Sequence, residues 1–147
     1  MNEAPLYLLD TNILVHYVRG GHVQQRIEAE YRLLATPEAP LLCYVSEAEI
    51  RSLAVQLGWE AVRLNQLGYL LTMVRRIHIH EPHILQAYVA IDSHSVASGV
   101  TMGKNDLWIA AVAHVTGATL LTTDRDFDHL QERYLLRHWI DPSTESG

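Results

Sequence analysis

The chain has 147 residues, one cysteine and a formal charge of −6 at pH 7, a length that suits one domain with its own hydrophobic core. The lone Cys43 excludes an internal disulfide, and the acidic balance argues against a protein whose whole surface attracts nucleic acid. No apolar run reaches the roughly 18 residues of a membrane helix, and the N-terminus lacks the features of a signal peptide. We therefore expect a cytoplasmic protein with no membrane partner.

Short apolar runs that are typical of β-strands occur at residues 6–9, 41–45, 77–80 and 119–122. Between them, apolar residues recur at every third or fourth position, which is the period of an α-helix. Residues 107–115 are apolar on nearly all sides, so this helix should lie buried near the centre. Strands that alternate with helices form parallel sheets covered on both faces. The pattern predicts a three-layer α/β/α fold around a central, mostly parallel sheet of four to five strands.

Nothing in the sequence marks a boundary between domains. No repeat, low-complexity tract or linker divides the chain, so we expect residues 1–147 to form a single domain. The last residues, 141–147, are polar and should be flexible. Cys43 lies in the apolar run 41–45, where a small buried thiol is the ordinary interpretation.

Four acidic residues fall at positions that a parallel sheet brings together. Asp10 follows the first predicted strand and Asp124 the last, while Glu49 and Asp106 lie in the first turns of predicted helices. Ligands of such sheets bind beyond the carboxyl ends of the strands. Carboxylates that gather there repel one another and raise each other's pKa unless a cation lies between them. Mg²⁺ and Mn²⁺ prefer oxygen ligands, so the pattern indicates a metal site.

Each of these acids also has a structural interpretation. Asp10 could cap the helix that follows it, Asp106 could complement the dipole of its helix with Asn105 as the cap, and Ser46 with Glu49 matches a capping box. For each acid alone the structural interpretation is the stronger one, but the four together favour the metal site. A zinc site at His78, His80 and His83 is disfavoured, because no cysteine or fourth ligand lies nearby.

Four motifs together resemble a known family. They are "LLDTNILV" around Asp10, "VSEAEIRSLA" around Glu49, "GVTMGKNDLWIAAVA" around Asp106 and "ATLLTTDRDFDHL" around Asp124. In this order, and over about residues 6–130, they resemble the PIN-domain nucleases, and within them the VapC-type toxins of prokaryotic toxin–antitoxin pairs. The resemblance implies a PIN-like fold and a Mg²⁺- or Mn²⁺-dependent endoribonuclease that cleaves RNA. It also implies a homodimer that a cognate antitoxin protein neutralises.

The resemblance also implies roles for single residues. It makes Asp10, Glu49, Asp106 and Asp124 the catalytic acids and the metal ligands. Asn12 would brace Asp10, and the hydroxyl of Thr122 would support the site or contact the substrate. Asp126 would be a fifth acid, which either approaches the metal through water or starts the turn before Phe127. The neighbouring Glu47 should point away from the site, and Lys104 and Arg125 are candidate phosphate contacts or solvated side chains.

Two rival functions remain open on the sequence. A phosphotransferase of the haloacid-dehalogenase type would need an acid two residues after Asp10, where Asn12 stands. A non-catalytic PIN-like module could bind RNA or protein through the same surface, although the presence of all four acids disfavours it. The helical region 48–74 carries more apolar residues than one core stripe needs, Trp59, Leu64, Leu67 and Leu70 among them, so we expect a twofold dimer there.

Overall fold

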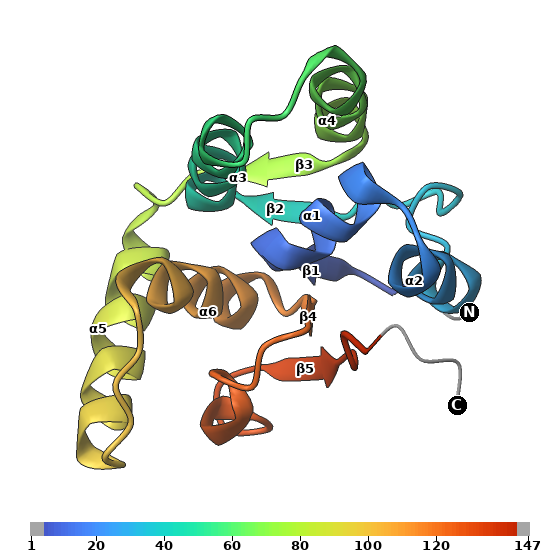
Figure 1. Ribbon diagram of the computed structural model, residues 1–147. Helices are drawn as coiled ribbons and strands as arrows, with labels where there is room; N and C mark the ends of the chain where they lie inside the picture. Colours follow the sequence, from blue (N-terminus) through green and yellow to red (C-terminus); the bar gives the residue numbers. More distant parts are fainter. Residues whose placement is uncertain (1–4, 144–147) are drawn as a thin grey trace.

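A computed structural model of the chain describes residues 5–143 and contains a five-stranded sheet (Figure 1). Its strands are β1 (Tyr7–Leu9), β2 (Leu41–Cys43), β3 (Arg75–Ile77), β4 (Thr119–Thr122) and β5 (Leu136–Trp139). They lie in the order β3-β2-β1-β4-β5, and every neighbouring pair is parallel. The predicted fold class, a mostly parallel sheet in an α/β/α arrangement, is confirmed. The expected flexible tail, 141–147, lies partly outside the described residues.

Helices cover both faces of the sheet. One face carries α1 (Thr11–Arg19), α2 (His22–Tyr31), α3 (Tyr44–Gln56) and α4 (Ala61–Met73), and the other carries α5 (Pro82–Ala97), α6 (Lys104–Thr116) and the short 3₁₀ turn η1 (Asp128–Leu130). Figure 1 shows α5 outside α6 on one side of the sheet. Within residues 5–143, no helix combines the length and the apolar character that crossing a bilayer requires.

Alternating side chains of the central strands build two separate cores. Leu8 and Leu120 point into the core beneath α5 and α6, whereas Leu9 and Leu121 point into the core beneath α1–α4. All four are at most 3% exposed. Successive strand residues point to opposite faces, so a sheet with both faces covered requires such unbroken apolar runs.

Helix α6 is the buried central helix that the sequence predicts. Residues 109–113 are at most 1% exposed, because α6 packs against β2 and β4 on one side and α5 on the other. The alanines at 110, 111 and 113 add little bulk to this crowded position. The position of α6 also fixes where its first turn, with Asp106, meets the sheet.

The strand order places a crevice between β1 and β4. The chain passes from β1 to β2 and β3 on one side of the sheet, and then crosses to β4 and β5 on the other. Such a reversal leaves an opening beyond the carboxyl ends of the two central strands, where parallel α/β proteins bind their ligands. Asp10 follows β1 and Asp124 lies two residues beyond β4, so both belong to this crevice.

The predicted strands differ from the structure at several boundaries, and one strand was not predicted. The strand predicted at 77–80 begins two residues earlier, as β3, and ends at Ile77, so His78 and His80 lie beyond the strand. The two arginines of β3 are exposed, as an edge strand allows. A search for apolar runs therefore could not identify the start of this strand. The run 41–45 ends at Cys43 because Tyr44 begins α3, and the half-exposed edge strand β5 was not among the four predicted runs.

The expected dimer residues lie mostly inside the protein. Trp59, Leu67 and Leu70 are 6%, 3% and 2% exposed and belong to the core beneath α1–α4, so they are not available to a second copy. Only Leu64, at 46%, faces outward. The apolar surplus of this region therefore fills the core, because α4 packs against α1.

Candidate active site

Asp10 is fixed at the end of β1 by two hydrogen bonds. Its Oδ1 accepts from the backbone N–H of Thr11 at 2.8 Å, and its Oδ2 accepts from the Thr122 hydroxyl at 2.7 Å. The second bond follows from the parallel register, because Leu8 lies opposite Leu120, and Asp10 and Thr122 each come two residues later in the chain. Asp10 does cap α1, as one interpretation of the sequence held, but its second oxygen joins it to β4. The carboxylate is only 5% exposed.

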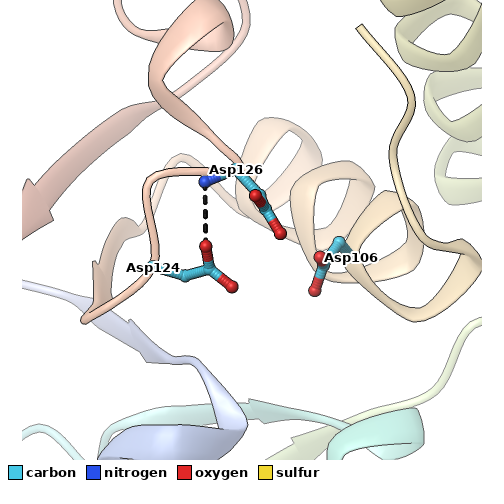
Figure 2. Close-up of side chains that lie close together, drawn as sticks. All are labelled: Asp106, Asp124 and Asp126. Atoms are coloured by element: carbon cyan, nitrogen blue, oxygen red, sulfur yellow. Dashed lines mark hydrogen bonds between the residues drawn. The ribbon is translucent and has the colours of Figure 1, made fainter.

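Three further carboxylates converge beside it (Figure 2). Asp106 projects from the first turn of α6, and Asp124 and Asp126 come from the loop after β4. One side-chain oxygen from each lies within 4.8 Å of the others. The loop is folded by its own bonds: the Asp124 N–H donates to the Thr122 hydroxyl at 2.9 Å, and the Asp126 N–H donates to Asp124 Oδ1 at 3.0 Å. Thr122 thereby links Asp10 to the loop.

Glu49 approaches the same place from α3. Its Oε1 accepts a hydrogen bond of 2.8 Å from the Thr11 hydroxyl, so Thr11 serves both Asp10 and Glu49. Sequence reasoning missed Thr11, although a hydroxyl residue directly after Asp10 was visible. Glu47 points elsewhere, as expected, and forms ion pairs with Arg51 and Arg76.

The capping box of Ser46 with Glu49 is wrong, and so is the cap expected at Asn105. Helix α3 begins at Tyr44 after Cys43, so Ser46 lies in its first turn and cannot be the N-cap of a capping box with Glu49. The Ser46 hydroxyl is fully buried and has no hydrogen-bond partner among the described residues. Helix α6 is capped by the backbone of Gly103 and not by Asn105. Asp106 does lie in the first turn of α6, where its charge complements the helix dipole, as the structural interpretation held.

Burial and mutual repulsion disfavour the charged forms of these acids. Burial is the main cause that raises the pKa of Asp10 to about 6, and the nearby charges of Asp124 and Glu49 add to it. The pKa of Asp106 is raised to about 7, first by burial and then by the charges of Asp10, Asp124, Asp126 and Glu49. The pKa of Asp126 is raised as well, by burial and by Asp124. The acids therefore form one electrostatic unit.

The arrangement fits a hard divalent cation. Within residues 5–143, no lysine, arginine or histidine forms an ion pair with Asp10, Glu49, Asp106, Asp124 or Asp126. Carboxylate oxygens that gather without a counter-charge are the donors that Mg²⁺ and Mn²⁺ prefer. Asp106, Asp124 and Asp126 could hold such an ion, with Asp10 and Glu49 close enough to add negative charge.

Other residues singled out in the sequence lie differently. Asn12 is exposed on α1, and among the described residues it makes no hydrogen bond to Asp10, whose oxygens bind Thr11 and Thr122. The Arg125 guanidinium lies 3.8 Å over the ring of Trp139, and Lys104 is exposed at the start of α6. In the described part of the chain the metal-ligand cluster consists of acids, and His78, His80 and His83 do not form one.

The parallel sheet and its all-carboxylate centre define an α/β protein with a cluster of acids that could hold a cation. Residues 7–133 match the PIN domain, and the chain belongs to this family. A comparison of the sequence with curated proteins gives no significant match.

Solved structures show the same fold. The structure of VapBC2 from Rickettsia felis, bound to a DNA fragment from their promoter, contains a chain with 22% identity and a TM-score of 0.76, over 92% of this chain and 99% of that one. VapBC-1 from nontypeable Haemophilus influenzae gives 22% identity and a TM-score of 0.70, over 91% and 97%. FitAcB from Neisseria gonorrhoeae contains a chain with 24% identity and a TM-score of 0.70, over 89% of this chain and 95% of that one. These likenesses show the fold.

Proposed function

We propose that this protein is an endoribonuclease that hydrolyses RNA phosphodiester bonds with Mg²⁺ or Mn²⁺. The observation that carries the proposal is the convergence of Asp106, Asp124 and Asp126 beside Asp10 and Glu49, in a chain of the PIN-domain family. The acids stand at the topological switch point of the sheet, where a substrate strand has access. The family membership connects this geometry to nuclease chemistry.

Some side chains of the site would bind the ion, and others position the ligands. Asp106 and Asp124 would hold the ion, and Asp126 and Glu49 would complete the negative field around it. When bound, the ion lowers the pKa of an attacking water and offsets the charge of the phosphoryl oxygens. Asp10 is kept in one orientation by its two hydrogen bonds, and Thr122 holds the Asp124 loop in register with it.

The raised pKa values couple cation binding to pH. With its pKa near 7, Asp106 carries a proton in part of the molecules at neutral pH. A cation must displace this proton, because only the ionised carboxylate is a ligand. Metal affinity should therefore rise as the pH rises from about 6 to about 8.

We further propose that the chain is the toxin of a VapBC-type pair, acts in the cytoplasm, and binds a cognate antitoxin and a second copy of itself. Support comes from the structural neighbours, which are described as VapBC and FitAB complexes. The surface also leaves large apolar side chains for partners to cover. On α3, α4 and their connection these are Val55, Leu57, Val62, Leu64 and Tyr69, and on α5 they are Leu85, Val89 and Val96.

The direct test of the activity is cleavage of a mixed RNA by purified protein, first with EDTA and then with excess Mn²⁺. We expect no cleavage in EDTA, cleavage after Mn²⁺ is added, and little cleavage by Asp106→Asn in either condition. Cleavage that persists in EDTA would overturn the metal-dependent mechanism. RNA binding without cleavage by the Mn²⁺-loaded parent would support the non-catalytic module instead.

The toxin assignment has a separate test in cells. Induced expression of the parent in a bacterial host should stop growth, whereas Asp106→Asn at the same protein level should not. Equal growth of the two cultures would remove the toxin assignment and leave the enzyme assignment to the cleavage assay.

A further inference from the structure

A hollow of about 350 Å³ opens beside the acidic centre, between α3 and α6. Glu49 lines it, and Asn105, which precedes Asp106, closes it from the side of α6. The remaining lining comes from α3, where residues 49, 52, 53 and 56 share one face because they are three to four positions apart. Glu49 therefore borders both the hollow and the cluster of acids.

Three side chains of this hollow are neutral and polar at their tips. Ser52, Gln56 and Asn105 are exposed, and their side chains form no hydrogen bond with another of the described residues. Val45 and Leu53 are half-buried and supply apolar walls. The hydroxyl of Ser52 and the amides of Gln56 and Asn105 therefore supply hydrogen-bond donors and acceptors to a hollow with apolar walls.

The charge of the hollow excludes a phosphate as its occupant. Among residues 5–143 no lysine or arginine lines it, and the one charged residue that does, Glu49, is an acid. A flat, neutral group with apolar faces and a polar edge suits it better, and a nucleobase has this character. Amides of asparagine and glutamine pair with two atoms of adenine at once, and proteins recognise single-stranded RNA through such unstacked bases.

The geometry points to a base-specificity pocket: we propose that Ser52, Gln56 and Asn105 bind an adenine of the RNA strand next to the phosphate at the acidic centre. This inference rests on the proposed ribonuclease function and adds a sequence preference to it. Gln56 and Asn105 are the specificity-determining residues, and Ser52 adds a hydroxyl from the same helix face.

The test is cleavage of a randomised oligoribonucleotide library with Mn²⁺, followed by sequencing of the cut ends. We expect the parent to enrich adenine about fivefold or more at one fixed position relative to the cut. This value is the lower end of the discrimination between bases that one bidentate hydrogen-bonded pair provides. The double variant Gln56→Ala/Asn105→Ala should cleave less and lose this enrichment. Asn65→Ala/Gln66→Ala removes two exposed amides from α4 instead and should keep the parent profile.

A binding measurement supplies a readout that does not depend on turnover. In EDTA, fluorescence anisotropy with Asp106→Asn should show tighter binding of an adenine-rich oligonucleotide than of a cytosine-rich one. Adding Gln56→Ala/Asn105→Ala should remove that difference. Matching circular dichroism would show that the exposed substitutions leave the fold intact.

The possible failures are distinguishable. If no library member is cleaved with Mn²⁺, the proposed function fails. If cleavage occurs with no base enriched, with a base other than adenine enriched, or with adenine enrichment that survives in the double variant, the pocket is overturned while the ribonuclease stands. An oligonucleotide preference in EDTA that the double variant retains would also overturn it.

Discussion

Asp10→Asn gives the sharpest stability experiment, because the raised pKa of Asp10 sets the sign of the effect and its approximate size. The folded protein raises the pKa of Asp10 from 3.8 to about 6, chiefly by burial. A carboxyl with a raised pKa binds its proton more tightly when folded, so its contribution to stability is complete below the unfolded value and is lost as the pH rises through the folded one. Metal-free protein should therefore lose stability between mildly acidic and neutral pH.

The size of this loss follows from the two pKa values. The full shift corresponds to about 3 kcal/mol, of which about 1.4 kcal/mol is lost between about pH 5 and about pH 7.5. The asparagine variant has no such loss, because its side chain stays neutral. Its altered hydrogen bond with Thr122 costs about 1 kcal/mol at either pH and cancels from the comparison. Removing the charge of Asp10 also lowers the pKa of Asp106, because Asp10 is one of the charges that raise it. The variant therefore loses less stability at Asp106 as well when the pH rises.

Urea unfolding followed by circular dichroism, in EDTA at the two pH values, measures this difference. Relative to the parent, Asp10→Asn should gain about 1.4 kcal/mol or more on going to the higher pH. Saturating Mn²⁺ at the higher pH should make the parent more stable than Asp10→Asn. The parent binds the cation more tightly and is therefore stabilised more by mass action. A stability difference between the two proteins that is equal at both pH values would refute the reasoning.

Three further changes test other parts of the account. Glu49→Gln keeps an oxygen that can accept from Thr11, so it should melt like the parent, yet need more Mn²⁺ for the same RNA cleavage; equal activity at limiting Mn²⁺ would remove Glu49 from the site. Thr122→Val removes the hydroxyl that joins Asp10 to the Asp124 loop, so Mn²⁺ affinity measured by calorimetry should fall at least several-fold, and an unchanged affinity would contradict the positioning role. Light scattering of the protein alone should give the mass of a dimer, and a monomer at assay concentration would count against the proposed self-association.

The central elements of the fold could be predicted from the sequence because their burial requires apolar residues. The apolar runs that form β1, β2 and β4 are buried on both faces of the sheet, and the helix at 107–115 is apolar on nearly all sides, so the hydrophobic pattern locates them. The edge strands were harder. Exposed arginines in β3 and alternating polar residues in β5 break the apolar pattern, and only pairing with the inner strands defines them.

The candidate site was predictable to the same degree, and for a physical reason. Asp10 and Asp124 stand where strands end, and topology brings such positions together without any detail of side-chain packing. The role of Thr11 depends on the approach of α3 to α1, which no local pattern reveals. The exposure of Asn12 and the proximity of Asp126 to Asp106 likewise depend on how the chain turns after β1 and β4.

The central claim is that the converging carboxylates bind a divalent ion, and Mn²⁺-soaked crystals test it most directly. An anomalous difference map recorded with saturating Mn²⁺ should show a peak between the carboxylates of Asp106 and Asp124, and the peak should be absent from crystals of Asp106→Asn. A map from the soaked parent with no peak beside these carboxylates, or with Mn²⁺ bound only elsewhere on the surface, would contradict the account.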